Sequence, residues 1–193
     1  MAALIIGLVL FLGAHSVRIF ADSWRAQRIA SMGEKPWKGA YTIVSLIGFA
    51  LIVWGFGMAR QHPVVIWSPP RGMNHLAALL MLFSFILLPA AYVPRNAIKA
   101  KLHHPMVLSV KVWAFAHLLA NGNLADVVLF GAFLVWAVLD FRAARQRDRA
   151  GNVQYAAGTA KGTAITVVIG LVAYAVFVFW AHAFLIGVSP LGF

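Results

Sequence analysis

The chain has 193 residues, of which 62% are hydrophobic and only 11% are charged. Roughly a quarter of the residues in soluble domains are charged, so this composition excludes an ordinary soluble domain and predicts one integral-membrane domain over residues 1–193. The net charge is +11, and the absence of cysteine excludes disulfides, thiolate-held iron–sulfur clusters and cysteine nucleophiles.

Six apolar segments follow one another along the chain and predict an all-α, polytopic helical bundle with about six transmembrane helices. They cover residues 2–20, 39–59, 73–93, 105–120, 124–141 and 164–189. The first is expected to be a retained span and not a signal peptide, because its positive charges follow the apolar run. The fourth has only 16 residues, or about 24 Å of helix. It is therefore expected to be sunken, or paired with the fifth as a tight hairpin.

The number of basic residues alternates between high and low in successive connectors, which are the stretches between the apolar segments. Connectors one, three and five together hold thirteen Lys and Arg residues, whereas connectors two and four and the C-terminus together hold two. The positive-inside rule therefore places the odd connectors in the cytoplasm and both termini outside. Because topology accounts for the charge, no nucleic-acid partner is expected. The longest polar connector is predicted at residues 142–163.

Several titratable side chains fall within the apolar segments, where they are costly and often functional. They are His15, His75, Lys111, His117, Asp126 and His182. Ordinary roles are available to each: a buried histidine can donate to a carbonyl of a neighbouring helix, and Lys111 can extend toward the surface. Asp126 opens the fifth segment, where a carboxylate stabilises a helix N-terminus. His103 and His104 lie at the inner end of the fourth segment.

His117 has the most informative neighbours. Trp113, Ala114 and Asn121 share its helical face by their spacing of three and four residues. A small residue beside a histidine leaves room for a flat ligand, and the tryptophan can pack alongside it. The pattern is compatible with a porphyrin site.

Five stretches in order resemble the NnrU family of membrane proteins, up to about residue 149. They are "FLGAHSVRIFADSWR", "VWGFGMAR", "IWSPP", "AAYVPRNAIK" and "HHPMVLSVKVWAFAHLLANGNLADVVLFGAFLVWAVLDFR". The resemblance implies a multi-pass protein of the bacterial inner membrane, associated with the reduction of nitrite and nitric oxide in denitrification. Its expected partners are membrane lipids and either a denitrification reductase or an assembly partner.

Relatives of this family, the 15-cis-zeta-carotene isomerases, bind haem b and use it for a cis–trans isomerisation. The resemblance implies that the histidines of the "HS" and "W-x-x-A-H" motifs, here His15 and His117, are the haem-iron ligands. The relatives also have a cysteine that has been proposed as an alternative ligand, and its position is Ala114 here, so no thiolate switch is available. The arginine usual before the His-Pro pair is His103.

Predicted topology separates the two expected ligands. His15 falls in the cytoplasmic half of the membrane and His117 in the outer half, roughly 10–15 Å apart along the membrane normal. His75 and His182, both in the outer half, are therefore alternate ligands. The expected cofactor-binding set is His15, His104, Trp113, Ala114, His117 and Asn121.

Two further functions compete with haem binding, and the three differ in whether the chain is an enzyme. The "HHP…GN" arrangement is similar to the "RHP…GN" region of isoprenylcysteine methyltransferases, which would make His104 and Asn123 binders of S-adenosylmethionine. Alternatively, the bundle is non-catalytic and binds a lipid, a quinone or a partner subunit. In that case glycines in the spans serve close helix packing; they are Gly48, Gly55, Gly57 and Gly131.

Overall fold

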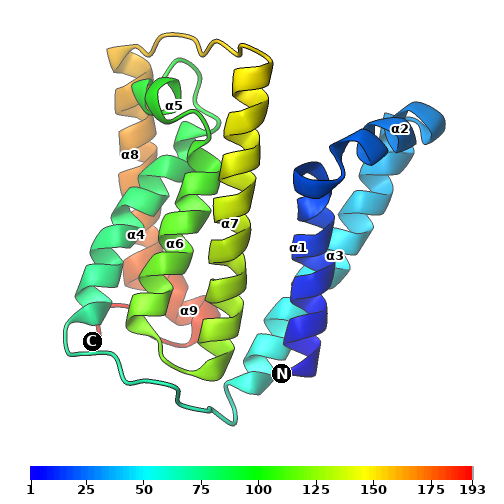
Figure 1. The fold of residues 1–193 in the computed structure, drawn as a ribbon. Coiled ribbons are helices and arrows are strands. Elements are labelled where there is room, and N and C mark those ends of the chain that lie inside the picture. The colour runs from blue at the N-terminus through cyan, green and yellow to red at the C-terminus, as the bar shows by residue number, and fades with distance from the viewer. Residues whose placement is uncertain (193) are drawn as a thin grey trace.

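The computed structural model describes residues 1–192 and is helical, with no strand in that range (Figure 1). The elements are α1 (Ala2–Phe20), α2 (Asp22–Met32), α3 (Glu34–Ala59), α4 (Met73–Ala90), α5 (Ala97–Leu102), α6 (Pro105–Ala120), α7 (Leu124–Ala150), α8 (Ala160–Val176), the π-helix η1 (Phe177–Ala181) and α9 (His182–Ile186). The predicted all-α membrane bundle is confirmed.

Among residues 1–192, five helical segments are long and apolar enough to cross a membrane: α1, α3, α4, α7 and the run Ala160–Ile186, which contains α8, η1 and α9. The sixth, α6, is apolar but has only 16 residues, as expected for the short fourth span. Three residues, Asn121 to Asn123, join it to α7, so the predicted tight hairpin is present. The chain is thus a multi-pass membrane protein whose exposed apolar side chains, such as Phe49 and Trp54 on α3, suit contact with lipid.

Two polar regions differ from the expectation. The first connector contains the helix α2, and α7 continues nine residues beyond the predicted end at residue 141, to Ala150. The predicted linker of residues 142–163 is therefore reduced to residues 151–159. Hydropathy indicates only where the apolar part of a helix ends. The helix itself can continue beyond that point through Ala, Arg and Gln, which are good helix formers.

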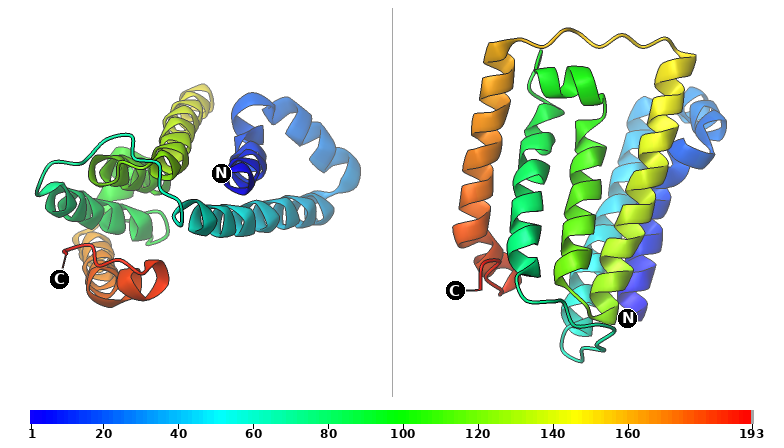
Figure 2. Two further views of the ribbon diagram at one scale, coloured as in Figure 1. Left: turned by 90° about the horizontal axis from the view of Figure 1, so that it is seen from below. Right: turned by 60° about the vertical axis from the view of Figure 1, so that its left-hand side comes forward.

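The long helices form a row, in the order α3, α1, α7, α6, α4, α8, in which each packs mainly on its neighbours (Figures 1 and 2). Both termini lie at one end, the terminal end, while α2, α5 and residues 151–159 lie at the other, which we call the basic end. Termini on the same side agree with an even number of crossings, as the topology prediction requires. Between α4 and α6, the Ser84 and Ser109 hydroxyls each donate to the other residue's carbonyl at 2.9 Å.

Glycines let α1 and α3 approach closely. A Cβ added to Gly48 would lie 2.7 Å from the backbone nitrogen of Phe11, and one added to Gly55 would also meet the backbone of α1. The packing prediction is thus right for Gly48 and Gly55. It is wrong for Gly57 and Gly131, where an added Cβ would meet open space.

Gly48→Ala should destabilise the protein by roughly 1–3 kcal/mol, because the added methyl group forces the two backbones apart. Gly57→Ala is the matched control on the same helix, and it should be neutral or stabilising by up to about 1 kcal/mol from helix propensity. Thermal unfolding in detergent measures both. Equal melting temperatures for the two variants would contradict the close-packing assignment.

Candidate functional site

His15 presents a free imidazole nitrogen at the basic end of α1. Its Nδ1–H donates to the carbonyl of Phe11 at 2.7 Å, and its ring stacks on the Phe11 ring with the centroids 4.2 Å apart. Tyr41 of α3 and Trp136 of α7 complete the aromatic surroundings, at 5.1 and 6.1 Å between ring centroids. Because a carbonyl only accepts, Nδ1 carries the proton and Nε2 keeps its lone pair, the arrangement typical of metal-binding histidines.

A cavity of about 810 Å³, here called the basic-end cavity, opens beside His15. Its walls come from α1, α2, α3, α6 and α7, so it lies where the α1–α3 pair meets the rest of the row. It combines aromatic and apolar side chains with charged ones. The aromatic and apolar residues include Trp37, Tyr41, Met106, Val107 and Trp136, and the charged ones are Arg18, Arg25, Glu34, Lys38, Asp140, Arg147 and Asp148. Such a lining suits an amphipathic ligand.

His104 also lines the basic-end cavity, as part of a polar cluster. Its Nε2 lies 2.8 Å from Oδ2 of Asp148, and the Tyr155 hydroxyl donates to the same oxygen at 3.0 Å. The His103 Nδ1 lies 3.6 Å from that oxygen, and its ring meets Tyr155 edge-on at 4.2 Å. The hydrogen bonds of this cluster hold Tyr155, and with it residues 151–159, near the start of α6. Burial and the hydrogen bond to Asp148 together raise the pKa of Tyr155 to about 12.

His117 lies in the packed core and outside the basic-end cavity. Its Nδ1–H donates to the Trp113 carbonyl at 2.8 Å, and Phe130 of α7 stacks on its ring at 4.6 Å. Ala114 is fully buried, so the space expected beside it for a flat ligand is filled by core side chains. The Asn121 amide donates to the His117 carbonyl at 2.9 Å and so satisfies the end of α6.

Three aromatic rings lie between the two expected iron ligands. The ring centroids of Phe11 and Phe133 are 5.9 Å apart, and those of Phe133 and Trp113 are 5.3 Å apart. His15 stacks on Phe11 at one end of this series, and the His117 ring lies tilted against Trp113 at the other. The structure therefore brings His15 together with His104, and it does not bring His15 together with His117.

The alternate ligands lie elsewhere. His75 is exposed on α4, and the His182 Nδ1–H donates to the Val188 carbonyl at 2.7 Å. Neither histidine lines the basic-end cavity or the second cavity, at the terminal end. Within residues 1–192, no three His, Cys, Asp or Glu side chains gather closely enough to hold a metal ion by themselves.

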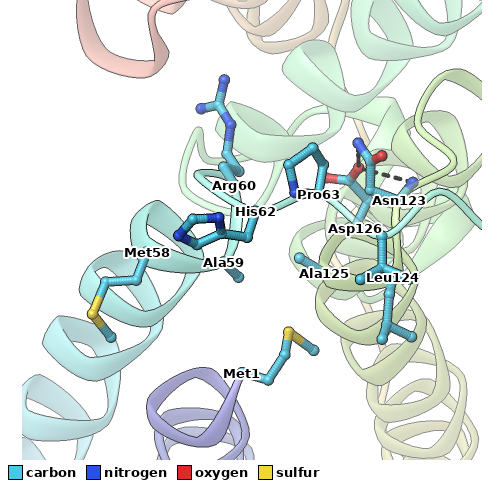
Figure 3. A pocket seen from close by; sticks show the side chains of 11 residues that line it. Met1, Met58, Ala59, Arg60, His62, Pro63, Asn123, Leu124, Ala125 and Asp126 are labelled. Carbon is cyan, nitrogen blue, oxygen red and sulfur yellow. Dashed lines mark hydrogen bonds between the residues drawn. The ribbon is translucent and has the colours of Figure 1, made fainter.

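The second cavity, of about 520 Å³, lies at the terminal end between α3 and the start of α7 (Figure 3). Met58 and His62 line it on one side, and Asn123 and Asp126 on the other. Its carboxylate is already used, because Asp126 and Asn123 form a capping box at the N-terminus of α7. The predicted capping role of Asp126 is therefore confirmed.

The residues expected for an S-adenosylmethionine site do not converge. His104 precedes the first turn of α6, and Asn123 follows its last turn. The 16 residues of the helix separate them by about 24 Å. His104 and Asn123 therefore lie at opposite ends of α6.

Several cavity residues are absent from the sequence-predicted site, notably Tyr41, Trp136, Asp140 and Arg147. The sequence contains a pattern that could have identified two of these residues. Asp140 is a charged residue at the end of an apolar run, and Trp136 precedes it by four residues, which places both on one helical face. Tyr41 lies on another helix, and only the fold brings it to the site.

The model of the NnrU protein family matches residues 3–190. The match therefore extends past residue 149 and includes the last helices, beyond the range of the resembling motifs. Comparisons with curated proteins and with solved structures give no match.

The Tyr155 hydroxyl should titrate late, because its pKa is raised from 10.0 to about 12. A raised folded-state pKa means that the stabilisation it provides is complete below pH 10.0 and is lost as the pH rises through about 12. Tyrosinate absorbance, recorded for the wild type and for Tyr155→Phe, isolates this residue by difference. A difference curve centred at pH 10 would contradict the hydrogen bond to Asp148.

Proposed function

The chain belongs to the NnrU protein family, and from that premise we propose that it binds haem b in the basic-end cavity and serves nitrite and nitric oxide reduction in the bacterial inner membrane. The observation that carries the proposal is His15, which lines the cavity and uses Nδ1, not Nε2, for its hydrogen bond to Phe11. His117 lines no part of the basic-end cavity, so His15 is the residue that would hold the haem iron there.

The donor set of the cavity fits haem b. An imidazole with its tautomer fixed by a backbone carbonyl suits ferrous and ferric iron. The rings of Tyr41 and Trp136 lie beside His15, while Arg18 and Arg147 add positive charge to the cavity lining. When bound, the haem supplies an iron centre for electron transfer or for binding a small molecule such as nitric oxide.

The residues around the cavity would each have a separate role in holding the ligand. His15 would hold the iron, and the aromatic side chains of the lining would exclude water from the bound ligand. His104 is hydrogen-bonded to Asp148 at the edge of the cavity, where a paired imidazole and carboxylate can hold a proton beside the ligand. The role of the protein is thus to hold and orient a redox centre at the basic end.

Protein purified in mild detergent from haem-replete bacteria should show a Soret band. His15→Ala should lower the haem content per protein by about ten-fold or more. Substituting a residue that only hydrogen-bonds to a metal ligand already lowers metal affinity by that much, and His15 is the proposed ligand itself. His117→Ala is the comparison variant, and it should keep the band because His117 stacks in the core. A colourless wild type, or one that instead carries a quinone or lipid, would exclude the haem proposal.

The denitrification role can be tested in the host. A chromosomal His15→Ala substitution should slow anaerobic growth on nitrite and cause nitric oxide to accumulate, because the haem site is lost while the protein is still inserted. Immunoblotting of the membrane fraction controls for expression. Wild-type growth and nitric oxide levels in a strain whose purified His15→Ala protein lacks haem would separate haem binding from denitrification.

A further inference from the structure

The cationic side chains that line the basic-end cavity differ in whether a carboxylate lies near them. Lys38 is paired with Glu34, at 2.7 Å between Nζ and Oε1. Arg25 lies 3.7 Å from Asp22 of its own helix. Within residues 1–192, Arg18 has no carboxylate within ion-pair distance.

A second arginine is held next to Arg18. The Arg147 guanidinium on α7 donates through Nη1 to the Arg18 carbonyl on α1 at 3.2 Å, and its Nη2 lies 3.9 Å from Asp140. Arg147 therefore contacts the backbone of Arg18 across the two helices, and within residues 1–192 Asp140 is the carboxylate within ion-pair distance of Arg147. Such an excess of positive charge favours an anionic group between them.

Arg18 lies close to His15 on the same helix. Arg18 follows His15 by three residues on α1, which puts both on one face about 4.5 Å apart along the axis. Both line the same cavity, together with Arg147. A ligand held by the His15 imidazole would therefore direct an acidic edge toward the two guanidinium groups.

We propose that Arg18 and Arg147 form an anion clamp that binds the propionate groups of haem b while His15 ligates its iron. This inference rests on the proposed function and adds the determinant of orientation: the acidic edge of the ring faces the basic end. Guanidinium groups bind carboxylates through paired hydrogen bonds, so two arginines match the two propionates of one ring.

Arg18→Gln tests the clamp without disturbing the contact between α1 and α7, because Arg147 is bonded to the Arg18 backbone carbonyl. Haem should transfer from this variant to an external haem-binding protein roughly threefold to tenfold faster than from the wild type, as expected for a partly exposed charge pair. Arg28→Gln is the control, since Arg28 packs over Trp24 and does not line the cavity. It should leave the rate unchanged.

The dimethyl ester of iron protoporphyrin, which lacks the two carboxylates, distinguishes a clamp from a structural role. The wild type should release the ester faster than haem b, and this difference should be smaller in Arg18→Gln, which keeps Arg147 as the one remaining member of the clamp. If Arg18→Gln loses the ester as much faster than the wild type as it loses haem, Arg18 acts on the fold and the clamp is excluded.

Two other outcomes have defined meanings. A Soret band in the wild type with equal haem release from Arg18→Gln overturns the clamp and leaves the haem proposal standing, whereas no Soret band in the wild type overturns both. If phosphorus analysis shows that Arg18→Gln loses bound phospholipid while keeping haem, the clamp holds a lipid headgroup, and the propionate assignment is wrong.

Discussion

The contact between α1 and α7 decides whether the site exists. The N-terminal pair α1–α3 meets the rest of the row mainly through this contact. Phe11 packs toward Phe133 in its middle, and Arg147 bonds to the Arg18 carbonyl at the basic end. His15 acquires its aromatic neighbour Trp136 across the same contact. The cavity therefore depends on a contact between two helices that are far apart in the sequence.

Most of the fold could be predicted from hydropathy and charge, because lipid restricts a spanning chain to helices that satisfy their own backbone groups. The spans, the short α6 and the Asp126 cap all follow from local patterns. The helix α2 and the last nine residues of α7 could not be predicted in this way. Their sequences are polar, and hydropathy does not distinguish a polar helix from a polar loop.

The candidate site could be predicted only in part. His15 and His104 are recognisable in sequence as polar residues within or beside apolar segments, and the structure brings both to one cavity. His117 has an equally suggestive neighbourhood, yet Phe130 of the next helix fills its flat face. That difference depends on which residues of α7 face α6 and α1, and no local spacing in the sequence determines it.

The arrangement of the helices in a row has a consequence for unfolding. A helix in a closed bundle touches several others and tends to unfold together with them. In a row, each helix depends on its immediate neighbours, so stability approaches a sum of neighbouring contacts, as in repeat proteins. Loss of the contact between α1 and α7 would release α1 and α3 as a pair and leave α4, α6, α7 and α8 assembled. The protein is therefore expected to unfold in two steps, and the basic-end cavity would be lost in the first of them.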